Sequence, residues 1–152
     1  AKRPLMLIEG LVETIYLDGN ARTWTLPVFD APPKNAPGLK RLLLPQGELA
    51  QFHDGAEGMR YLAFVELVAD AVRGNHYHEH KPEWIYVIRG ALVLTLEDIA
   101  TKSRVNVEMR TGDLAFIHTG VAHALRTLES GQAVEFSPVA FDSADVFRYP
   151  LV

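Results

Sequence analysis

The chain has 152 residues, the ordinary size of one domain that can bury its own hydrophobic core. A net charge of −4 argues against nucleic acid or an anionic membrane as the main partner. Cysteine is absent, which excludes disulfides and thiol nucleophiles and leaves His, Asp and Glu as the strong metal ligands. No apolar run is long enough to span a membrane and the first residues do not form a signal peptide, so we expect a cytoplasmic protein.

Turn signals divide the first third of the chain into short strands. The largely apolar stretch 5–16 ends at a strong turn signal over 18–20. Residues 22–29 alternate loosely between apolar and polar, and Pro27 predicts an edge strand, because proline cannot donate to a β ladder. Residues 39–44 form the next apolar segment.

Loops and one long apolar run follow. Three prolines predict a loop over 30–38, and a second loop is predicted over 53–58. Residues 59–72 are long enough for a buried helix, and their periodicity does not decide the matter. We favour a strand because the surrounding segments are strand-like.

The second half of the chain continues the β pattern. Residues 83–89 and 91–97 are predicted as two strands joined by a tight turn at Gly90, followed by a turn over 98–102. Residues 104–110 alternate apolar and polar side chains, which is typical of a half-buried strand. The remaining predicted strands cover 114–117, 123–128 and 132–140.

Turn signals recur at the spacing typical of a β-sandwich or barrel. The one suggestion of a helix is a short turn near 143–147. We see no boundary or repeat, so the sequence predicts a single all-β domain over 1–152.

The segment 73–83 carries the strongest chemical signal. It holds three histidines and two glutamates in eleven residues. His76, His78 and His80 alternate, so an extended strand would point all three to one face. Imidazoles beside a carboxylate are the usual ligands of a divalent metal. A further imidazole, His123, lies in the segment 112–123.

Two motifs in these segments resemble the cupin family. His76-x-His78, then four residues, Glu83, six residues and Gly90 resemble its first motif, over 74–90. The segment 112–127, with His123 at the family's histidine position, resembles the second. The departures fall at Asp70, His118 and Thr127, where the family usually has glycine, proline and asparagine.

This resemblance implies a double-stranded β-helix, or jelly-roll, cupin barrel. It also implies that His76, His78, Glu83 and His123 bind one divalent transition metal inside the barrel. Their mixed N/O donor set suits Zn, Ni, Fe or Mn. His80 is expected to be a neighbour of the site, because the family's chain turns before the glutamate and Pro82 supports a turn. In a less favoured alternative, His80 replaces His76.

Other polar and aromatic residues leave two interpretations each. Arg73 is an anion clamp at the rim or a solvated arginine. Glu66 and Glu135 are acid/base groups if they point inward, and ordinary strand residues otherwise. His53 and His118 are interpreted as surface histidines. Tyr61, Trp84 and Tyr86 either form an aromatic wall for a ligand or pack in the core or a dimer interface.

Two classes of function follow from the resemblance. The first is a metal-dependent enzyme acting on a small oxygen-rich molecule, such as a dioxygenase or a sugar isomerase or epimerase. Residues 73–78 resemble the Arg-Gly-x-His-x-His segment of cupins that modify nucleotide-linked sugars, where the first histidine, here His76, often serves as a base. The alternative is a non-catalytic module that binds or senses a small ligand. The resemblance also implies a homodimer.

Overall fold

The computed structural model describes residues 3–8, 11–35 and 38–152. Within these ranges the regular structure consists of β-strands and two single-turn 3-10 helices, η1 (Leu17–Gly19) and η2 (Ser143–Asp145). The expected all-β class is confirmed. No helix of the described residues is long and apolar enough to cross a membrane.

The first strands form an antiparallel meander that joins the main sheet. β1 (Arg3–Ile8) pairs with β2 (Leu11–Tyr16), and β2 pairs with β3 (Ala21–Thr25). The stretch 5–16 is therefore two strands, and residues 9–10 between them lie outside the described ranges. β3 also pairs with β11 (Asp113–Ile117), so the prediction of an edge strand over 22–29 is wrong for residues 22–25 and holds for residues 28–29, which lie at the edge of a second, small sheet. Pro27 lies beyond the end of β3, where its missing N–H interrupts no ladder.

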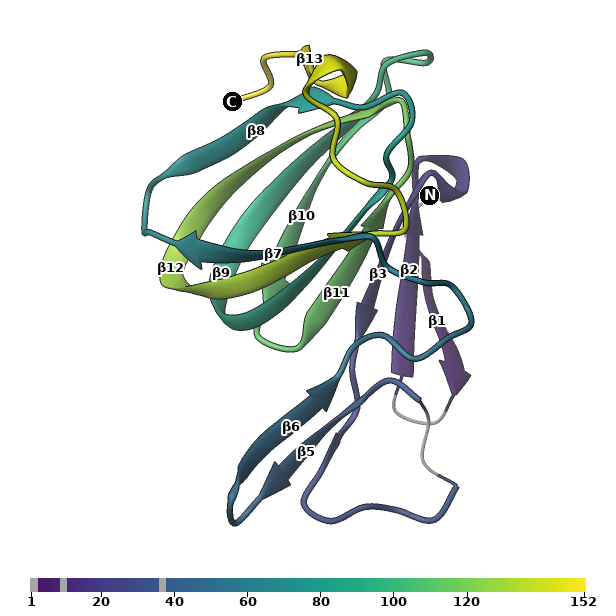
Figure 1. Ribbon diagram of the computed structural model, residues 1–152, viewed down its shortest axis with the longest axis vertical. Helices are drawn as coiled ribbons and strands as arrows, with labels where there is room; N and C mark the ends of the chain where they lie inside the picture. Colours follow the sequence, from purple (N-terminus) through teal and green to yellow (C-terminus); the bar gives the residue numbers. More distant parts are fainter. Residues whose placement is uncertain (1–2, 9–10, 36–37) are drawn as a thin grey trace.

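A small three-stranded sheet projects from one end of the molecule (Figure 1). β4 (Val28–Phe29) is parallel to β5 (Lys40–Leu44), and β5 forms a hairpin with β6 (Gly47–Gln51). The sequence prediction placed β5 and missed β6, whose mixture of polar and apolar residues gives no clear alternation.

One long strand takes part in both layers of the barrel. β9 (Glu83–Asp98) pairs with β11 through its first residues and with β10 (Arg104–Arg110) through its last. The prediction of two strands joined by a turn at Gly90 is therefore wrong. Gly90 is a bend with φ of +111°, and a Cβ atom there would lie 2.6 Å from the carbonyl oxygen of Glu129. Glycine allows the strand to bend and continue.

The second long strand is β12 (Val121–Ser137), which pairs with β9 along both halves. It also pairs with β8 (Val72–Tyr77) near its start and with β7 (Tyr61–Leu67) near its end. The predicted break after residue 128 is a pair of register shifts between Thr127 and Gln132 rather than an end of the strand.

These strands curl into a barrel (Figure 1). The side chains on its inner face form an aliphatic core. β13 (Phe147–Arg148) pairs with β8 near the C-terminal end. The core alternates along β9, β10 and β12, as expected for strands with one face inward. Its largest fully buried aliphatic members are Leu67, Leu92, Leu94, Leu96, Met109 and Ile117.

Candidate metal centre

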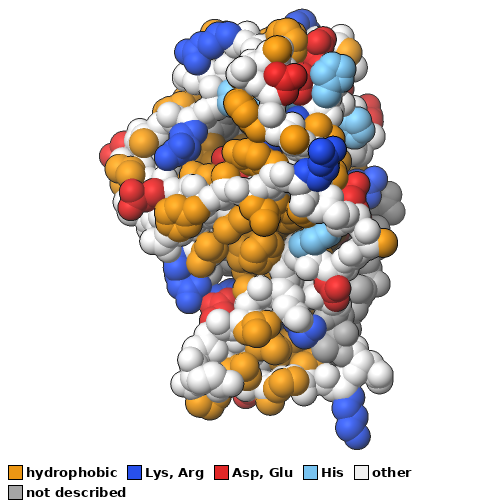
Figure 2. All heavy atoms as spheres, in the orientation of Figure 1, with side chains coloured by type: hydrophobic (Ala, Val, Ile, Leu, Met, Phe, Trp, Pro, Cys, Tyr) orange, Lys and Arg blue, Asp and Glu red, His pale blue; other side chains and the backbone are white. Residues whose placement is uncertain are grey.

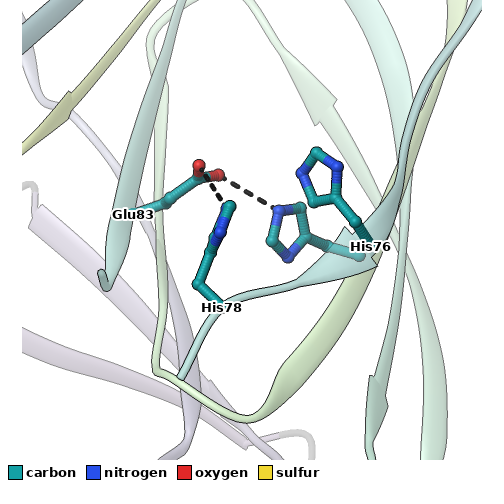
Figure 3. A group of neighbouring side chains, drawn as sticks. His76, His78 and Glu83 are labelled. Atoms are coloured by element: carbon teal, nitrogen blue, oxygen red, sulfur yellow. Dashed lines mark hydrogen bonds and ion pairs between the residues drawn. The ribbon is translucent and has the colours of Figure 1, made fainter. Parts of the chain in front are cut away.

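Four side chains from three segments converge inside the barrel. The ligand atoms of His76, His78, Glu83 and His123 all lie within 4.8 Å of one another. Figure 3 shows His76, His78 and Glu83 pointing toward a common point. These are the four residues that the cupin resemblance implied, and the fold brings all of them together.

Strand pairing explains why the histidines meet. His76 in β8 lies opposite His123 in β12 in the antiparallel register. His78 shares the face of His76, because side chains two residues apart on an extended chain point the same way. The ring centroid of His76 lies 4.9 Å from that of His78 and 4.8 Å from that of His123.

A glycine lets β8 and β12 approach closely at this point. Gly74 has a φ of +88°, and a Cβ atom there would lie 2.7 Å from the carbonyl oxygen of His123. Any other residue at this position would meet the backbone of β12 beside a candidate ligand.

Backbone carbonyls fix the orientation of two imidazoles. The Nδ1 atom of His78 lies 2.8 Å from the carbonyl oxygen of Asp145, and Nδ1 of His123 lies 3.0 Å from that of Val121. A carbonyl oxygen can only accept, so each Nδ1 carries the proton. In a neutral ring the lone pair is then on Nε2. Histidines that bind metals commonly donate their other ring N–H to a carbonyl in this way.

Both Nε2 atoms face the same carboxylate. Nε2 of His78 lies 3.1 Å from one oxygen of Glu83, and Nε2 of His123 lies 3.2 Å from the other. The contact of His123 has the distance of an ion pair but not the alignment of a hydrogen bond, and this buried nitrogen has no hydrogen-bond partner. A lone pair facing a carboxylate requires a proton or a cation between them.

The spacing fits a cation. Two ligands at right angles, each about 2.1 Å from an ion, lie about 3 Å apart. The donors are imidazole nitrogens and a carboxylate oxygen, which suit a divalent transition metal. The cluster could therefore hold such an ion.

Mutual electrostatics set the protonation of the cluster. Burial, followed by the nearby rings of His123 and His78, lowers the pKa of His76 to about 4. Burial would raise the pKa of Glu83, but His123, His78 and Lys81 outweigh it and hold that pKa well below its usual range. Burial would lower the pKa of His123, but the charge of Glu83 raises it instead. His76 and Glu83 are thus ready to act as ligands at neutral pH, whereas a proton competes for His123.

Lys81 belongs to the cluster and was missed by the sequence analysis. Its Nζ atom donates to Oε1 of Glu83 at 2.8 Å and lies 4.3 Å from the centroid of the Tyr61 ring. The side chain is 4% exposed. Lys81 lies in the loop before β9, so strand alternation gave no signal for it.

Asp145 was also missed, and it ties η2 to the loop of the site. Its carboxylate accepts the backbone N–H groups of Glu79, His80 and Lys81 at 2.8–3.2 Å. The sequence predicted a turn here, which η2 confirms, but no local pattern shows a contact that spans over 60 positions.

The other histidines lie outside the cluster. His80 is exposed, and only its backbone N–H contacts Asp145, so it is a neighbour of the site. His53 and His118 are also exposed, in agreement with their interpretation as surface residues.

The cluster opens into a cavity of about 340 Å³. Besides the four candidate ligands, it is lined by Tyr61, Arg73, Gly74, Lys81, Ile85, Leu94, Leu125, Glu135, Phe141 and Val146. Of the two strand glutamates, Glu135 faces this cavity and Glu66 is exposed. Tyr61 lines the cavity, whereas Trp84 and Tyr86 pack in an aromatic cluster elsewhere.

Comparison with protein-family models matches a cupin domain over residues 63–139. The chain belongs to the cupin family. This match covers both long strands and all four candidate ligands, and confirms the resemblance and the barrel fold. A comparison with curated proteins found no match.

Several solved structures share the fold of this cupin. One is a dTDP-6-deoxy-D-glucose-3,5-epimerase from Legionella pneumophila Philadelphia 1 in complex with dTDP-4-keto-L-rhamnose, with a TM-score of 0.68 and 13% identity over 88% of this chain and 74% of that chain. Another is a sugar 3,4-ketoisomerase from Thermoanaerobacterium thermosaccharolyticum in complex with TDP, with a TM-score of 0.65 and 14% identity over 85% and 88% of the two chains. At these identities the similarity shows the fold alone.

Proposed function

We propose that this cupin is a metal-dependent enzyme that acts on a small oxygen-rich molecule. It would hold one divalent transition metal, Zn, Ni, Fe or Mn, through His76, His78, Glu83 and His123. The observation that carries the proposal is the pair of imidazoles whose Nδ1 atoms bind carbonyls while their Nε2 atoms face one carboxylate. The cluster opens into a cavity, so a small molecule can reach it.

The bound metal would act as a Lewis acid toward an oxygen atom of the substrate. The chain's own residues complete the chemistry around it. Glu83 balances part of the positive charge, and Lys81 holds Oε1 of that carboxylate in place. The carbonyls of Val121 and Asp145 keep the rings of His123 and His78 from turning.

Glu135 is the best placed group for moving a proton in the cavity. Burial and the nearby charge of Glu83 raise its pKa, although His123, Lys81 and Arg73 act in the opposite direction. Its carboxyl group therefore keeps a proton to a higher pH than an ordinary glutamate. A carboxyl group of this kind can act as a general acid or base.

The solved neighbours favour one reaction class. They are a dTDP-6-deoxy-D-glucose-3,5-epimerase and a sugar 3,4-ketoisomerase in complex with TDP, which supports isomerisation or epimerisation of a carbonyl compound. The cavity of about 340 Å³ is at the small end of ligand pockets and has room for a small carbonyl compound. The other reaction class that such a metal centre supports is oxidation of the substrate by dioxygen, as in a dioxygenase.

Metal analysis tests the site. We expect one divalent ion per chain in the purified protein after equilibration with Ni²⁺, and loss of at least about 100-fold in affinity in His78→Ala and His123→Ala, since even outer-shell changes cost 10–100-fold. His118→Ala is the matched control, because this histidine is exposed and outside the cluster. Unchanged affinity in the first two variants would refute the site.

Turnover is tested separately with the loaded protein. Small keto acids, diols and sugars are screened for solvent deuterium incorporation and for oxygen uptake. Deuterium incorporation at carbon supports the isomerase class, and oxygen uptake supports the dioxygenase class. Measurable binding with neither result would favour the non-catalytic binding module.

A further inference from the structure

The cavity lining mixes polar and apolar side chains. Its polar members are the four candidate ligands with Tyr61, Arg73, Lys81 and Glu135. Its aliphatic members include Ile85, Leu94 and Leu125, which are 3%, 0% and 5% exposed. Glu135 lies opposite Ile85, and Arg73 lies opposite Leu125, in the strand pairing. Phe141 and Val146, which are 56% and 37% exposed, continue this apolar lining. Figure 2 shows hydrophobic side chains gathered across the middle of the face that carries β7.

A polyhydroxylated ligand would place some of its hydroxyl groups against the aliphatic side chains of the lining. Each hydroxyl group placed against an aliphatic surface loses its hydrogen bonds to water without gaining a partner. Ile85, Leu94 and Leu125 therefore favour a ligand with an apolar body.

The charged side chains of the cavity favour an anion. Lys81 and Arg73 both line it. Arg73 donates to the backbone carbonyl of Glu66 at 3.3 Å, a bond that leaves its charge unneutralised. With a divalent ion bound, the positive charges exceed those of Glu83 and Glu135 even when both carboxylates are ionised. An anionic ligand restores the balance.

Lys81 is prepositioned to contact such an anion. Its Nζ atom is held by Glu83 and by the ring of Tyr61 inside the cavity wall. An ammonium group has three N–H donors, and the bond to Glu83 uses one of them. A ligand carboxylate beside the metal can accept another, and such a charge-assisted bond is among the stronger ones in proteins.

We propose that the ligand of this cavity is a small organic acid with an apolar body, such as a branched 2-oxo carboxylate. Its carboxylate and neighbouring oxygen face the metal and Lys81, and its body packs on Ile85, Leu94 and Leu125. This inference rests on the proposed metal site and narrows its substrate from oxygen-rich molecules in general. It disfavours neutral sugars.

Calorimetry on the Ni²⁺-loaded protein tests the inference with three compounds. These are 4-methyl-2-oxopentanoate, its methyl ester, which keeps the body and removes the charge, and D-xylose. The acid should bind at least 10-fold more tightly than the ester, and D-xylose should bind more weakly than both. In Lys81→Met that retains one Ni²⁺ per chain, affinity for the acid should fall at least 10-fold, and the ratio of acid affinity to ester affinity should fall with it. Lys34→Met, a change in an exposed loop, should alter neither.

The results separate this inference from the proposed function. Equal affinity for acid and ester, or tighter binding of D-xylose, in a protein with one Ni²⁺ per chain would overturn the inference and leave the metal site standing. Failure of the wild-type protein to take up metal would overturn both. Metal content is measured for Lys81→Met as well, so that loss of the ion is not mistaken for loss of the anion contact.

Discussion

The first residues of β9 present two contrasting faces. Glu83 and Ile85 point to the cavity, whereas Trp84 and Tyr86 belong to an aromatic cluster. Trp84 stacks on Trp24 with ring centroids 5.4 Å apart, and Tyr86 stacks on Phe52 at 4.4 Å. One face is filled with large rings, and the other borders a hollow with charged groups.

The contrast shows how stability and chemistry are divided across one strand. Filling one face with aromatic rings buries much apolar surface and holds β9 in place. The face that lines the cavity lacks such packing and carries buried charged groups instead. Changes on the filled face should therefore cost stability without altering the metal site, and changes on the hollow face should do the reverse.

The largest stability effect is expected on the filled face. Phe136 is 1% exposed within the aromatic cluster. Phe136→Ala should lower the free energy of unfolding by about 3–5 kcal/mol, because it leaves a cavity in a packed cluster. His76→Ala only enlarges a hollow and should cost metal-free protein about 1 kcal/mol or less. Urea unfolding of both variants measures the difference, and equal losses would contradict the division between the faces.

The same two variants should exchange places in a metal titration. Folded Phe136→Ala should bind Ni²⁺ with wild-type stoichiometry, whereas His76→Ala should lose affinity by at least about 100-fold. A wild-type affinity in His76→Ala would show that this histidine is not a ligand.

A second stability effect is expected where β8 meets β12. Gly74→Ala should destabilise the fold by about 1–3 kcal/mol, through a positive φ and the contact with the carbonyl of His123. Gly47→Ala is the matched control, because Gly47 has a φ of +123° with nothing within 4 Å of an added Cβ atom. A loss in Gly74→Ala no larger than in the control would show that the close approach to β12 is unimportant. Thermal unfolding compares them.

Local pattern in the sequence predicted part of the candidate site and none of its supports. The alternation alone placed His80 on one face with His76 and His78, and only the resemblance to the cupin motifs replaced His80 with Glu83 and the distant His123. Asp145 reaches the site through tertiary structure alone. Gly90 shows a different limit: the same residue suits a turn and a bend, and only the pairing of β9 with β12 distinguishes them.

The support from Asp145 should have a moderate effect on metal binding. Asp145→Ala removes the acceptor of three backbone N–H groups in the loop between His78 and Glu83, and should weaken Ni²⁺ binding about 10–100-fold. In Asp142→Ala the lost carboxylate is exposed and caps η2 by accepting from the backbone N–H of Ala144, away from the loop of the site, so affinity should stay within about twofold. Equal affinities in the two variants would remove Asp145 from the account.

The smallest effect is a pH dependence of proton release. The pKa of His123 is raised by Glu83, so this ring holds a proton below its folded pKa and must lose it to bind metal. His76, with a pKa of about 4, contributes no proton near neutral pH. Calorimetry in buffers of different ionisation enthalpy should show about one proton released per Ni²⁺ at pH 6 and fewer at pH 9.

The pair Glu83–His123 also shapes the stability of the metal-free protein. Because the pKa of His123 is raised in the folded protein, protonated His123 stabilises the fold. This stabilisation is complete below the ordinary histidine pKa and is lost as the pH rises through the raised, folded-state pKa. Because the pKa of Glu83 is lowered, ionised Glu83 stabilises the fold above the ordinary glutamate pKa. This stabilisation is lost as the pH falls through the lowered, folded-state pKa. If the number of protons released on Ni²⁺ binding does not change between pH 6 and pH 9, the coupling between Glu83 and His123 is contradicted.

X-ray absorption spectroscopy of the protein loaded with one Ni²⁺ per chain tests the central claim most directly, because it reports the ligands of the ion itself. The account predicts three imidazole ligands with oxygen donors completing the shell, and two imidazoles in His123→Ala. A shell of oxygen donors without imidazole scattering would contradict the assignment of His76, His78 and His123 to the metal centre.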